Sequence, residues 1–463
     1  MISGLRNLSK SKAIGSSSAR IISSARIIST AAATVFSAPK QRDADHPVRV
    51  YPVVVVGGGS GGCTIAAKLA RKYLDDDRVA VVEPSDIHYY QPLWTLIGAG
   101  IKKLDSNARP MAKCLPRKVS WIRDSVAVVH PEGNSLVTAT GKVIYYEHLV
   151  LACGLNPRFD LIKGLPEAFD VPGVCSNYSP FYVTKTRGAI ENFPATGGNA
   201  IFTFPHSTIK CPGAPHKIMY LADAAWRKAG KRHSVNVIYN SSLDVIFGVK
   251  KYADALWDQV IEKREMTINF RHNLVEVKGD AKEAVFELLD RPGETVTFPF
   301  EFLHVVPPMT TPAFLRNTDR LCNEFGFVDV CKETLQHNVF PNVFAIGDCS
   351  SLPTAKTAAA ASAQAAVLAR SFVAGLKGQK PTFTYDGYTS CPLVTGNGKC
   401  ILAEFDYQLQ PLETFPVDQG KERYSMFHVK QDLIPFIYWN FMLNGRWDGP
   451  AILRKLLHFD TRK

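Results

Sequence analysis

Short apolar runs along the chain alternate with stretches of helical periodicity. Val53–Val56 is a continuous apolar run of strand length, and the segment after it places Ile65, Ala66 and Leu69 on one side of a helix. Two more strands are predicted at residues 199–204 and 235–240. Strands that are interleaved with helices in this way predict an α/β fold with parallel sheets.

A glycine-rich turn joins the first predicted strand to the first predicted helix. Its G-x-G-x-x-G spacing lets the turn close, lets backbone approach a pyrophosphate and points the helix N-terminus at the phosphates. The next apolar run ends at Glu83, 21 residues after Gly62, where an acid suits the hydroxyls of a ribose. Together these features predict a dinucleotide site, and its turn consists of Gly57, Gly58, Gly59, Ser60, Gly61 and Gly62.

Two later segments indicate which dinucleotide binds. One is a strand that runs into a turn at Gly154, and the other is a strand followed by Gly347-Asp348 and an Ala-rich helix that opens with Lys356-Thr357. With the first turn, they resemble the two-dinucleotide-binding-domain flavoproteins of the disulfide reductase-like superfamily. The resemblance implies an FAD whose pyrophosphate and ribityl chain meet Asp348. It also implies that the helix N-terminus faces the flavin pyrimidine, where a positive helix end suits an anionic, reduced ring.

Flavoproteins of this superfamily usually insert a second nucleotide domain, which binds NAD(P)H through its own glycine fingerprint. Here the strand at 199–204 leads into "PHSTIKCPGAPHK", which has no such fingerprint. The strand at 235–240 ends in Asn240, without the acid that would bind a ribose. We therefore expect a second domain that keeps its shape but has lost its cofactor.

Cys211 stands where the second phosphate loop would otherwise lie. We expect Pro212 in the first turn of the following helix, because its missing N–H needs no partner there. The helix end, with Lys210 and Lys217 nearby, would then lower the pKa of Cys211 and favour the thiolate. The alternative is a small buried cysteine in a loop.

A second Cys-Pro pair occurs at Cys391, beyond the Ala-rich helix. Segments such as "TIKCPGAPHKIMYLADAAWRK", "IGDCSSLPTAKTAAA" and "DGYTSCPLVTG" make the chain, from about residue 50 onward, closely similar to the sulfide:quinone oxidoreductase family. The resemblance implies a redox disulfide between Cys211 and Cys391, whereas Cys153 and Cys349 are interpreted as structural. It also implies a set of flavin contacts, which comprises Gly57–Gly62, Glu83, Gln91, Val126, Asp348, Lys356 and Thr357.

The resemblance implies a reaction as well. Hydrogen sulfide attacks the disulfide, Cys391 carries the persulfide and Cys211 faces the flavin. The sulfane sulfur passes to a small thiophile, which is glutathione, coenzyme A or sulfite, and two electrons pass through FAD to ubiquinone. The alternatives are a type II NADH:quinone oxidoreductase, a flavocytochrome-type sulfide dehydrogenase and a non-catalytic flavoprotein. His206 and His216 are candidate proton carriers.

Positive charge is concentrated at the N-terminus. The net charge is +12, and residues 1–42 hold seven basic residues and no acid. Without them, 47 basic residues face 42 acidic ones, too small an excess to favour nucleic acid. The Arg- and Ser-rich composition predicts a mitochondrial transit peptide at 1–42, with a disordered basic tail as the alternative. The ten cysteines show neither a C-x-x-C pair nor zinc spacing, so no metal site is predicted.

The C-terminal segment is rich in aromatic residues. Rings at residues 436–447 alternate with basic residues that extend to Lys455, and the segment is too short to span a bilayer. This pattern predicts monotopic contact with the inner mitochondrial membrane, on the matrix side, where a quinone dissolved in lipid can reach the flavin. The alternative is a set of core helices that close the flavin domain.

The predicted organisation is a discontinuous FAD-binding domain around an inserted one. The FAD domain comprises residues 47–170 and 330–400, and the degenerate nucleotide domain comprises 175–329. A quinone- and membrane-facing segment follows at 401–463. The insertion explains why Gly57 and Asp348 can belong to one site.

Overall fold

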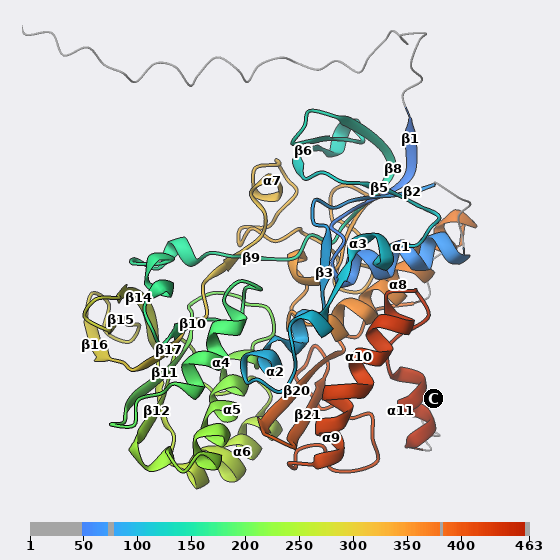
Figure 1. Ribbon diagram of the computed structural model, residues 1–463. Coiled ribbons are helices and arrows are strands. Elements are labelled where there is room, and N and C mark those ends of the chain that lie inside the picture. The colour runs from blue at the N-terminus through green and yellow to red at the C-terminus, as the bar shows by residue number, and fades with distance from the viewer. Residues whose placement is uncertain (1–48, 73–77, 380–382, 459–463) are drawn as a thin grey trace, which may run out of the picture. The chain divides into compact units, whose positions relative to one another are not determined.

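Two sheets with parallel strands form the framework of the protein (Figure 1). The structure is a computed structural model that describes residues 49–72, 78–379 and 383–458. The transit peptide predicted at residues 1–42 lies outside the described residues. The α/β class predicted from the sequence is confirmed.

The first sheet contains the strand that precedes the glycine turn. Its valines from Val53 to Val56 are at most 3% exposed, because α1 (Ser60–Lys72) packs against this strand and its neighbours. All strands of this sheet run in the same direction except β7, which pairs antiparallel with both β8 and β6. Their order is β5 (Val119–Ile122), β2 (Val79–Val82), β1 (Val50–Val56), β8 (Val143–Leu151), β7 (Ser135–Thr138) and β6 (Val126–His130), and β19 (Val343–Ala345) also pairs with β8.

The second sheet comes from the middle of the chain. Its five strands are all parallel, and helices connect several of them, as expected of a nucleotide-binding architecture. The strand order is β10 (Val174–Cys175), β17 (Phe302–His304), β11 (Gly198–Phe204), β12 (Val235–Ser241) and β13 (Thr267–Phe270). The accompanying elements are α4 (Val183–Glu191), α5 (Ala214–Lys228), α6 (Lys250–Leu256) and the antiparallel strands β14 (His272–Lys278), β15 (Glu283–Leu288) and β16 (Thr295–Pro299).

The chain crosses between the two sheets twice. β9 (Asn156–Pro157) follows β8, and β18 (Met309–Thr310) precedes β19; the two short strands pair antiparallel. The second sheet is thus inserted between two strands of the first. The exact domain boundaries stay predictions.

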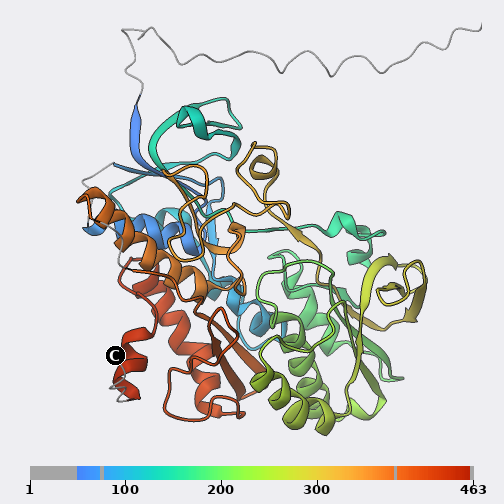
Figure 2. The same cartoon turned by 180° about the vertical axis from the view of Figure 1, so that it is seen from behind.

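A hairpin and a set of short helices end the chain. The hairpin consists of β20 (Thr389–Gly396) and β21 (Lys399–Phe405), and α9 (Tyr424–His428), α10 (Ile434–Ile437) and α11 (Ala451–Leu457) follow. We call residues 424–458 the C-terminal tail; Figures 1 and 2 both show it in red beside α8 (Ala358–Leu376). The remaining elements are α2 (Trp94–Gly98), α3 (Met111–Cys114), α7 (Ala313–Arg316), β3 (Ile87–Tyr89) and β4 (Ala108–Pro110).

Among the described residues, α8 is a helix long and apolar enough to cross a membrane. It has 19 residues, and the mean hydropathy of its 18-residue window is 1.3. However, 56% of that window is buried inside the fold, and α8 packs along α1. Core helices of water-soluble proteins share these properties, so α8 is weak evidence for a membrane span.

A buried carboxylate links α5 to the hairpin. Asp223 is fully buried and accepts hydrogen bonds from Arg227 Nε at 3.0 Å and Arg232 Nε at 2.6 Å. The Arg264 guanidinium lies 3.7 Å from the same carboxylate and donates to the carbonyl oxygen of Thr395 in β20. Removing the carboxylate would leave these cations without their buried partner.

We therefore expect Asp223→Ala to destabilise the protein by about 3–5 kcal/mol, the usual cost of breaking a buried ion pair. Asp254 makes a matched control, because its ion pair with Lys250 is exposed at both ends. Asp254→Ala should change stability by less than about 1 kcal/mol. Thermal and urea unfolding midpoints measure both effects, and equal midpoints for the two variants would contradict the prediction.

Candidate functional site

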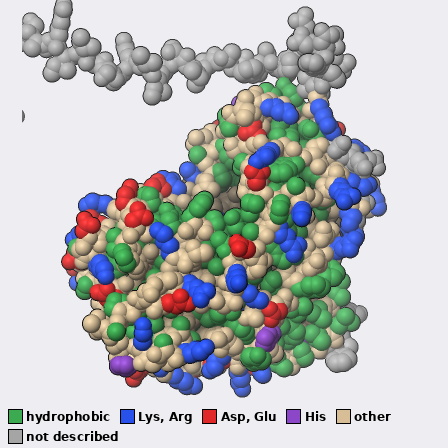
Figure 3. Space-filling view, in the orientation of Figure 1, with side chains coloured by type: hydrophobic (Ala, Val, Ile, Leu, Met, Phe, Trp, Pro, Cys, Tyr) green, Lys and Arg blue, Asp and Glu red, His purple; other side chains and the backbone are tan. Residues whose placement is uncertain are grey.

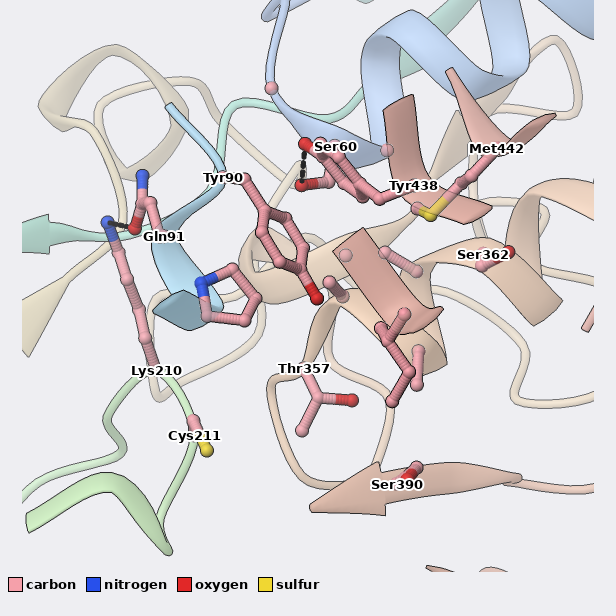
Figure 4. Close-up of a pocket in the computed structure, with 18 of the residues that line it drawn as sticks. Ser60, Tyr90, Gln91, Lys210, Cys211, Thr357, Ser362, Ser390, Tyr438 and Met442 are labelled. Carbon is pink, nitrogen blue, oxygen red and sulfur yellow. Dashed lines mark hydrogen bonds between the residues drawn. The ribbon is translucent and has the colours of Figure 1, made fainter. Parts of the chain in front are cut away.

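A cavity of about 500 Å³ lies where the glycine turn, the loop before α5, the start of α8, the hairpin and the C-terminal tail meet (Figure 4). Its volume is in the range of cofactor and ligand sites. We call it the central cavity. The predicted site residues that line it are Gly57, Gly58, Gly59, Ser60, Gly61, Glu83, Gln91, Cys211, Asp348, Lys356 and Thr357.

The turn after β1 has the geometry of a phosphate-binding loop. A Cβ atom on Gly62 would lie 1.8 Å from the Gly57 carbonyl oxygen, so α1 can approach the strand this closely only without a side chain there. Gly57 has a φ of +101°, which L-residues rarely adopt. A Cβ atom on Gly59 would meet nothing within 4 Å, so the backbone is open at that point. The turn can therefore receive a pyrophosphate at the N-terminus of α1.

Glu83 and Gln91 place polar groups beside this turn. The Glu83 carboxylate accepts hydrogen bonds from the backbone N–H of Gly58 at 2.6 Å and of Ser85 at 2.7 Å, which fix it at the cavity wall. Gln91 Oε1 accepts a hydrogen bond from Lys210 Nζ at 3.3 Å (Figure 4). A fixed carboxylate next to the turn suits a ribose.

Two predicted cofactor contacts lie outside the wall of the central cavity. Gly62 serves the contact between α1 and β1 described above. Val126 begins β6 and pairs with Thr138 at the edge of the first sheet. Its flavin contact was implied by the resemblance alone; the cavity gives it no support, and it stays a prediction.

The start of α8 forms another part of the wall. Thr357 caps the helix, since its Oγ1 accepts a hydrogen bond from the Ala360 N–H at 3.1 Å. The Lys356 side chain donates to the Ser350 carbonyl at 2.7 Å, and burial lowers the pKa of Lys356 to about 8. Burial also raises the pKa of Asp348, which lies in the turn after β19. A helix N-terminus and a lysine at one place suit an anionic part of a ligand.

Cys211 and Cys391 meet although 180 residues separate them. Their Sγ atoms lie 3.4 Å apart, and both cysteines are free thiols. A disulfide bond requires about 2.05 Å, so the pair is close to bonding distance in its dithiol form. Cys211 is partly exposed, whereas Cys391 in β20 is fully buried. The structure thus brings together the two cysteines that the resemblance implied as a redox pair.

The backbone of Cys211 forms a turn ahead of α5. Its φ is +49°, a left-handed conformation that is uncommon for a residue with a side chain. The Cys211 N–H donates to the Lys356 carbonyl at 2.8 Å, and the Cys211 carbonyl accepts from the Ala214 N–H at 2.8 Å. The helix begins at Ala214, and Pro215 is the proline in its first turn. The expectation for Pro212 was therefore wrong: the turn places Cys211 three residues before the helix.

Charge at the thiol pair is unevenly distributed. The hydrogen bond with Cys391 holds the pKa of Cys211 well below its usual value; burial opposes this shift, and the ammonium groups of Lys217 and Lys430 add to it. The same hydrogen bond, together with burial, raises the pKa of Cys391 well above its usual value. Cys211 is therefore the thiolate of the pair.

The cations at Cys211 come from two distant elements. Lys217 Nζ, on α5, lies 3.4 Å from Cys211 Sγ. Lys210 was also predicted to lower the pKa of Cys211, but its ammonium group donates a hydrogen bond to Gln91 Oε1 instead. Lys430, in the C-terminal tail, is 2% exposed and donates to the Pro92 carbonyl at 2.8 Å; burial lowers its pKa to about 8. Sequence reasoning missed Lys430, because nothing local connects it to a cysteine 219 residues earlier.

The second sheet lacks the groups that would hold a nicotinamide dinucleotide. The loop after β11 carries the Cys211 turn in place of a glycine fingerprint. Asn240, in β12, is fully buried and accepts a hydrogen bond from Asn269 Nδ2 at 2.8 Å. It offers no carboxylate to a ribose, and its side chain is shielded from the surface.

The other cysteines and histidines considered from the sequence are Cys153, Cys349, His206 and His216. Cys349 is fully buried and donates to the Leu151 carbonyl, whereas Cys153 lines the central cavity. His216 is buried among aromatic rings, and burial lowers its pKa to about 3; His206 is exposed. In the described ranges, His, Cys, Asp and Glu form no group of three that could hold a metal ion.

The C-terminal tail supplies a hydroxyl that sequence reasoning also missed. The Tyr438 hydroxyl lies 2.8 Å from Ser60 Oγ (Figure 4). It also lies 2.5 Å from His88 Nε2. Tyr438 is 2% exposed, and its ring centroid lies 4.2 Å from that of Tyr90. The aromatic run at 436–447 was the available signal, but it was interpreted as a membrane surface.

Comparisons with known proteins agree with this geometry. Residues 51–191 match the family model for pyridine nucleotide-disulphide oxidoreductase. The chain is 53% identical to mitochondrial sulfide:quinone oxidoreductase of Mus musculus over 88% of this chain and 90% of that one. It is 43% identical to the protein of the same name from Dictyostelium discoideum, over 87% and 88%.

A solved structure has the same fold. The sulfide:quinone oxidoreductase of Aquifex aeolicus matches with a TM-score of 0.75 at 18% identity, over 89% of this chain and 96% of that one. At such identity the match shows the fold alone. The identity to the two mitochondrial relatives over nearly nine-tenths of the chain is what decides membership: the chain belongs to the sulfide:quinone oxidoreductase family.

Proposed function

We propose that this protein is a mitochondrial, FAD-dependent sulfide:quinone oxidoreductase. The observation that carries the proposal is the thiol pair Cys211 and Cys391, 3.4 Å apart beside the central cavity, at the place where a related fold would bind NAD(P)H. The alternatives are weaker. A type II NADH:quinone oxidoreductase needs a nicotinamide site that the Cys211 turn replaces, and a flavocytochrome-type dehydrogenase has no use for an apolar tail surface.

The central cavity fits FAD. The open backbone at Gly59 leaves room for a pyrophosphate, and Glu83 is fixed at the position of a ribose. At the other end, the α8 N-terminus and Lys356 suit the flavin pyrimidine. When bound, FAD supplies two-electron transfer between the thiol pair and ubiquinone.

The oxidised pair reacts as an electrophile. Hydrosulfide attacks Cys391 Sγ, the Cys211–Cys391 bond breaks, and Cys391 is left as a persulfide while Cys211 departs as a thiolate. A disulfide opens fastest toward the sulfur that is the better leaving group, which is the thiol of lower pKa. Cys211 is that thiol, because Lys217 and Lys430 stabilise its thiolate. This polarity agrees with the one implied by the family resemblance.

The outer sulfur of the Cys391 persulfide is then transferred to the thiophile. A thiophile anion, either a small thiolate such as glutathione or coenzyme A, or sulfite, bonds to that sulfur and leaves Cys391 as a thiolate. Cys391 then takes up a proton, because its raised pKa favours the thiol, and Cys211 remains the thiolate beside the buried ammonium group of Lys217. Their return to the disulfide releases the two electrons that complete the reaction.

Sulfide should bleach the flavin absorbance of the protein under anaerobic conditions, and added ubiquinone should restore it.

Cys211→Ser and Cys391→Ser should each retain FAD yet lose sulfide-dependent quinone reduction by at least about 10³-fold, since neither can form the disulfide. Cys331→Ser is the control, because the Cys331 thiol donates a hydrogen bond to Glu333 and neither residue lines the central cavity. Full activity in either site variant, or bleaching by NADH, would contradict the proposal.

Lys217→Met should raise the pKa of Cys211, since it removes the ammonium group that favours the thiolate. The fraction of thiolate at pH 7 then falls, and a shift of one pKa unit slows alkylation of Cys211 by about ten-fold. The rate of iodoacetamide labelling against pH, measured on the Cys211 peptide of the reduced protein, shows this as a profile displaced to higher pH. Lys210→Met should leave the profile in place, because that lysine bonds Gln91.

The exposed face of the C-terminal tail is the proposed membrane contact, on the matrix side of the inner mitochondrial membrane. Ile452 and Leu456 on α11 are each 68% exposed, and Phe436 is 56% exposed. Figure 3 shows hydrophobic side chains gathered over this part of the molecule. An apolar face of this kind, next to a cavity, gives a lipid-dissolved quinone a route to the site.

Replacing Ile452 and Leu456 together by Asp should weaken partition onto phosphatidylcholine vesicles by about 100-fold, given roughly 1.5 kcal/mol for each buried side chain. Flotation of the protein with vesicles measures the change. Phe325→Asp is the control: that ring is 74% exposed but lies before β19, outside the tail. Equal flotation of all three proteins would remove the tail from the membrane contact.

A further inference from the structure

Ser60, Tyr438 and His88 form a hydrogen-bond chain whose direction the structure fixes. His88 Nδ1 lies 2.9 Å from the Gly58 carbonyl oxygen, which can only accept, so Nδ1 carries the proton. Burial lowers the pKa of His88 to about 4, so the ring is neutral and its Nε2 is an acceptor. The Tyr438 hydroxyl therefore donates to Nε2, and Ser60 Oγ donates to Tyr438.

This chain ends on two residues of the glycine turn, Gly58 and Ser60. Gly58 is held on both sides of its Cα: its N–H donates to Glu83, and its carbonyl oxygen accepts from His88 Nδ1 and from Cys63 Sγ. Ser60 is the first residue of α1, where the phosphate of a dinucleotide would lie. Without Tyr438, the Ser60 hydroxyl loses its partner and His88 keeps a buried nitrogen unpaired.

Tyr438 reaches the turn only because the C-terminal tail is docked on α1, α8 and β4. The Trp439 ring lies under the Arg109 guanidinium at 4.2 Å. Asp448 pairs with Lys68 on α1 and with Arg370 on α8 at 2.8 Å. A Cβ atom on Gly445 would lie 2.7 Å from the backbone nitrogen of Lys68, so the tail lies directly on the α1 backbone.

We propose that Tyr438 and His88 are positioning residues of the dinucleotide site, through which the C-terminal tail holds Gly58 and Ser60 in their cofactor-binding form. The proposal rests on the proposed binding of FAD and adds to it that the tail is part of the cofactor site. FAD retention and docking of the tail are then coupled. Such coupling is reciprocal: FAD strengthens docking of the tail by the same factor by which docking strengthens FAD binding.

The coupling divides the tail into two parts with different roles. Tyr438, Trp439, Met442 and Leu443 are at most 8% exposed and form the inward face of the tail, whereas Phe436 and Phe441 are 56% and 39% exposed and form its outward face. When the outward face meets a bilayer, the inward face stays docked, since its release would expose the cofactor site. Membrane binding and FAD retention therefore occur together.

Tyr438→Phe tests the proposal, because it keeps the ring and removes only the hydroxyl. Loss of a hydrogen bond worth about 1–1.5 kcal/mol should raise the dissociation constant of FAD five- to ten-fold. FAD released on dilution of the holoenzyme is fluorescent and measures this. Tyr407→Phe is the matched control: its hydroxyl donates to the Lys332 carbonyl at 2.9 Å, and neither residue lines the central cavity. It should lower thermal stability without changing FAD affinity.

A double-mutant cycle separates positioning from general destabilisation. Ser60→Ala and Tyr438→Phe act through one chain, so the double variant should weaken FAD binding by no more than the larger single effect. FAD should also slow tryptic cleavage within the tail of the wild-type protein. The factor by which FAD lowers the cleavage rate should be five- to ten-fold smaller in Tyr438→Phe.

Failure of this proposal differs from failure of the proposed function. A wild-type protein that binds no FAD would refute both. Two results with a wild-type protein that binds FAD would refute the coupling alone. In one, Tyr438→Phe binds FAD with the affinity of the wild-type protein. In the other, the effects of Ser60→Ala and Tyr438→Phe on the dissociation constant of FAD multiply in the double variant.

Discussion

The contact between two sulfur atoms from distant parts of the chain, Cys211 before α5 and Cys391 in β20, is the constraint on which the site depends. A disulfide forms only when both sulfurs approach to about 2 Å, so a small displacement of the second sheet against the hairpin would end the chemistry. The fold controls this distance from both sides. The Cys211 N–H is bonded to Lys356, and Arg264 bonds Thr395 in the strand that carries Cys391. The buried charges around Asp223 therefore act on the thiol pair through the position of β20.

Much of the fold and half of the site followed from local sequence. The strand–turn–helix unit at Gly57, the acid at Glu83 and the cysteine before α5 each have a short signature, because the backbone there needs particular residues. Lys430, His88 and Tyr438 have none: each acts on a residue more than 25 positions away, and only tertiary packing brings them together. Pro212 was misplaced for a related reason, since two prolines near a helix start cannot be ranked without knowing where the turn ends.

The aromatic residues of the C-terminal tail show why one sequence pattern can support two structural interpretations. Alternating rings and basic residues suit a membrane interface, and they also suit a helix packed over a cofactor. In the structure, neighbouring residues face opposite ways: Trp439 is 8% exposed and Phe436 is 56% exposed. The two readings considered from the sequence therefore describe the two faces of one segment.

The exchange of a phosphate loop for a thiol turn has an electrostatic consequence. A phosphate loop relies on backbone N–H groups at a helix start, but Cys211 lies three residues before α5 and gains little from that helix end. Its thiolate is stabilised instead by the hydrogen bond with Cys391 and by two side-chain cations, one from α5 and one from the tail. The tail thus provides Lys430 for the thiol and Tyr438 for the glycine turn. A segment that touches both ends of the central cavity can be displaced only by disturbing both, which favours a tail that remains docked throughout the reaction.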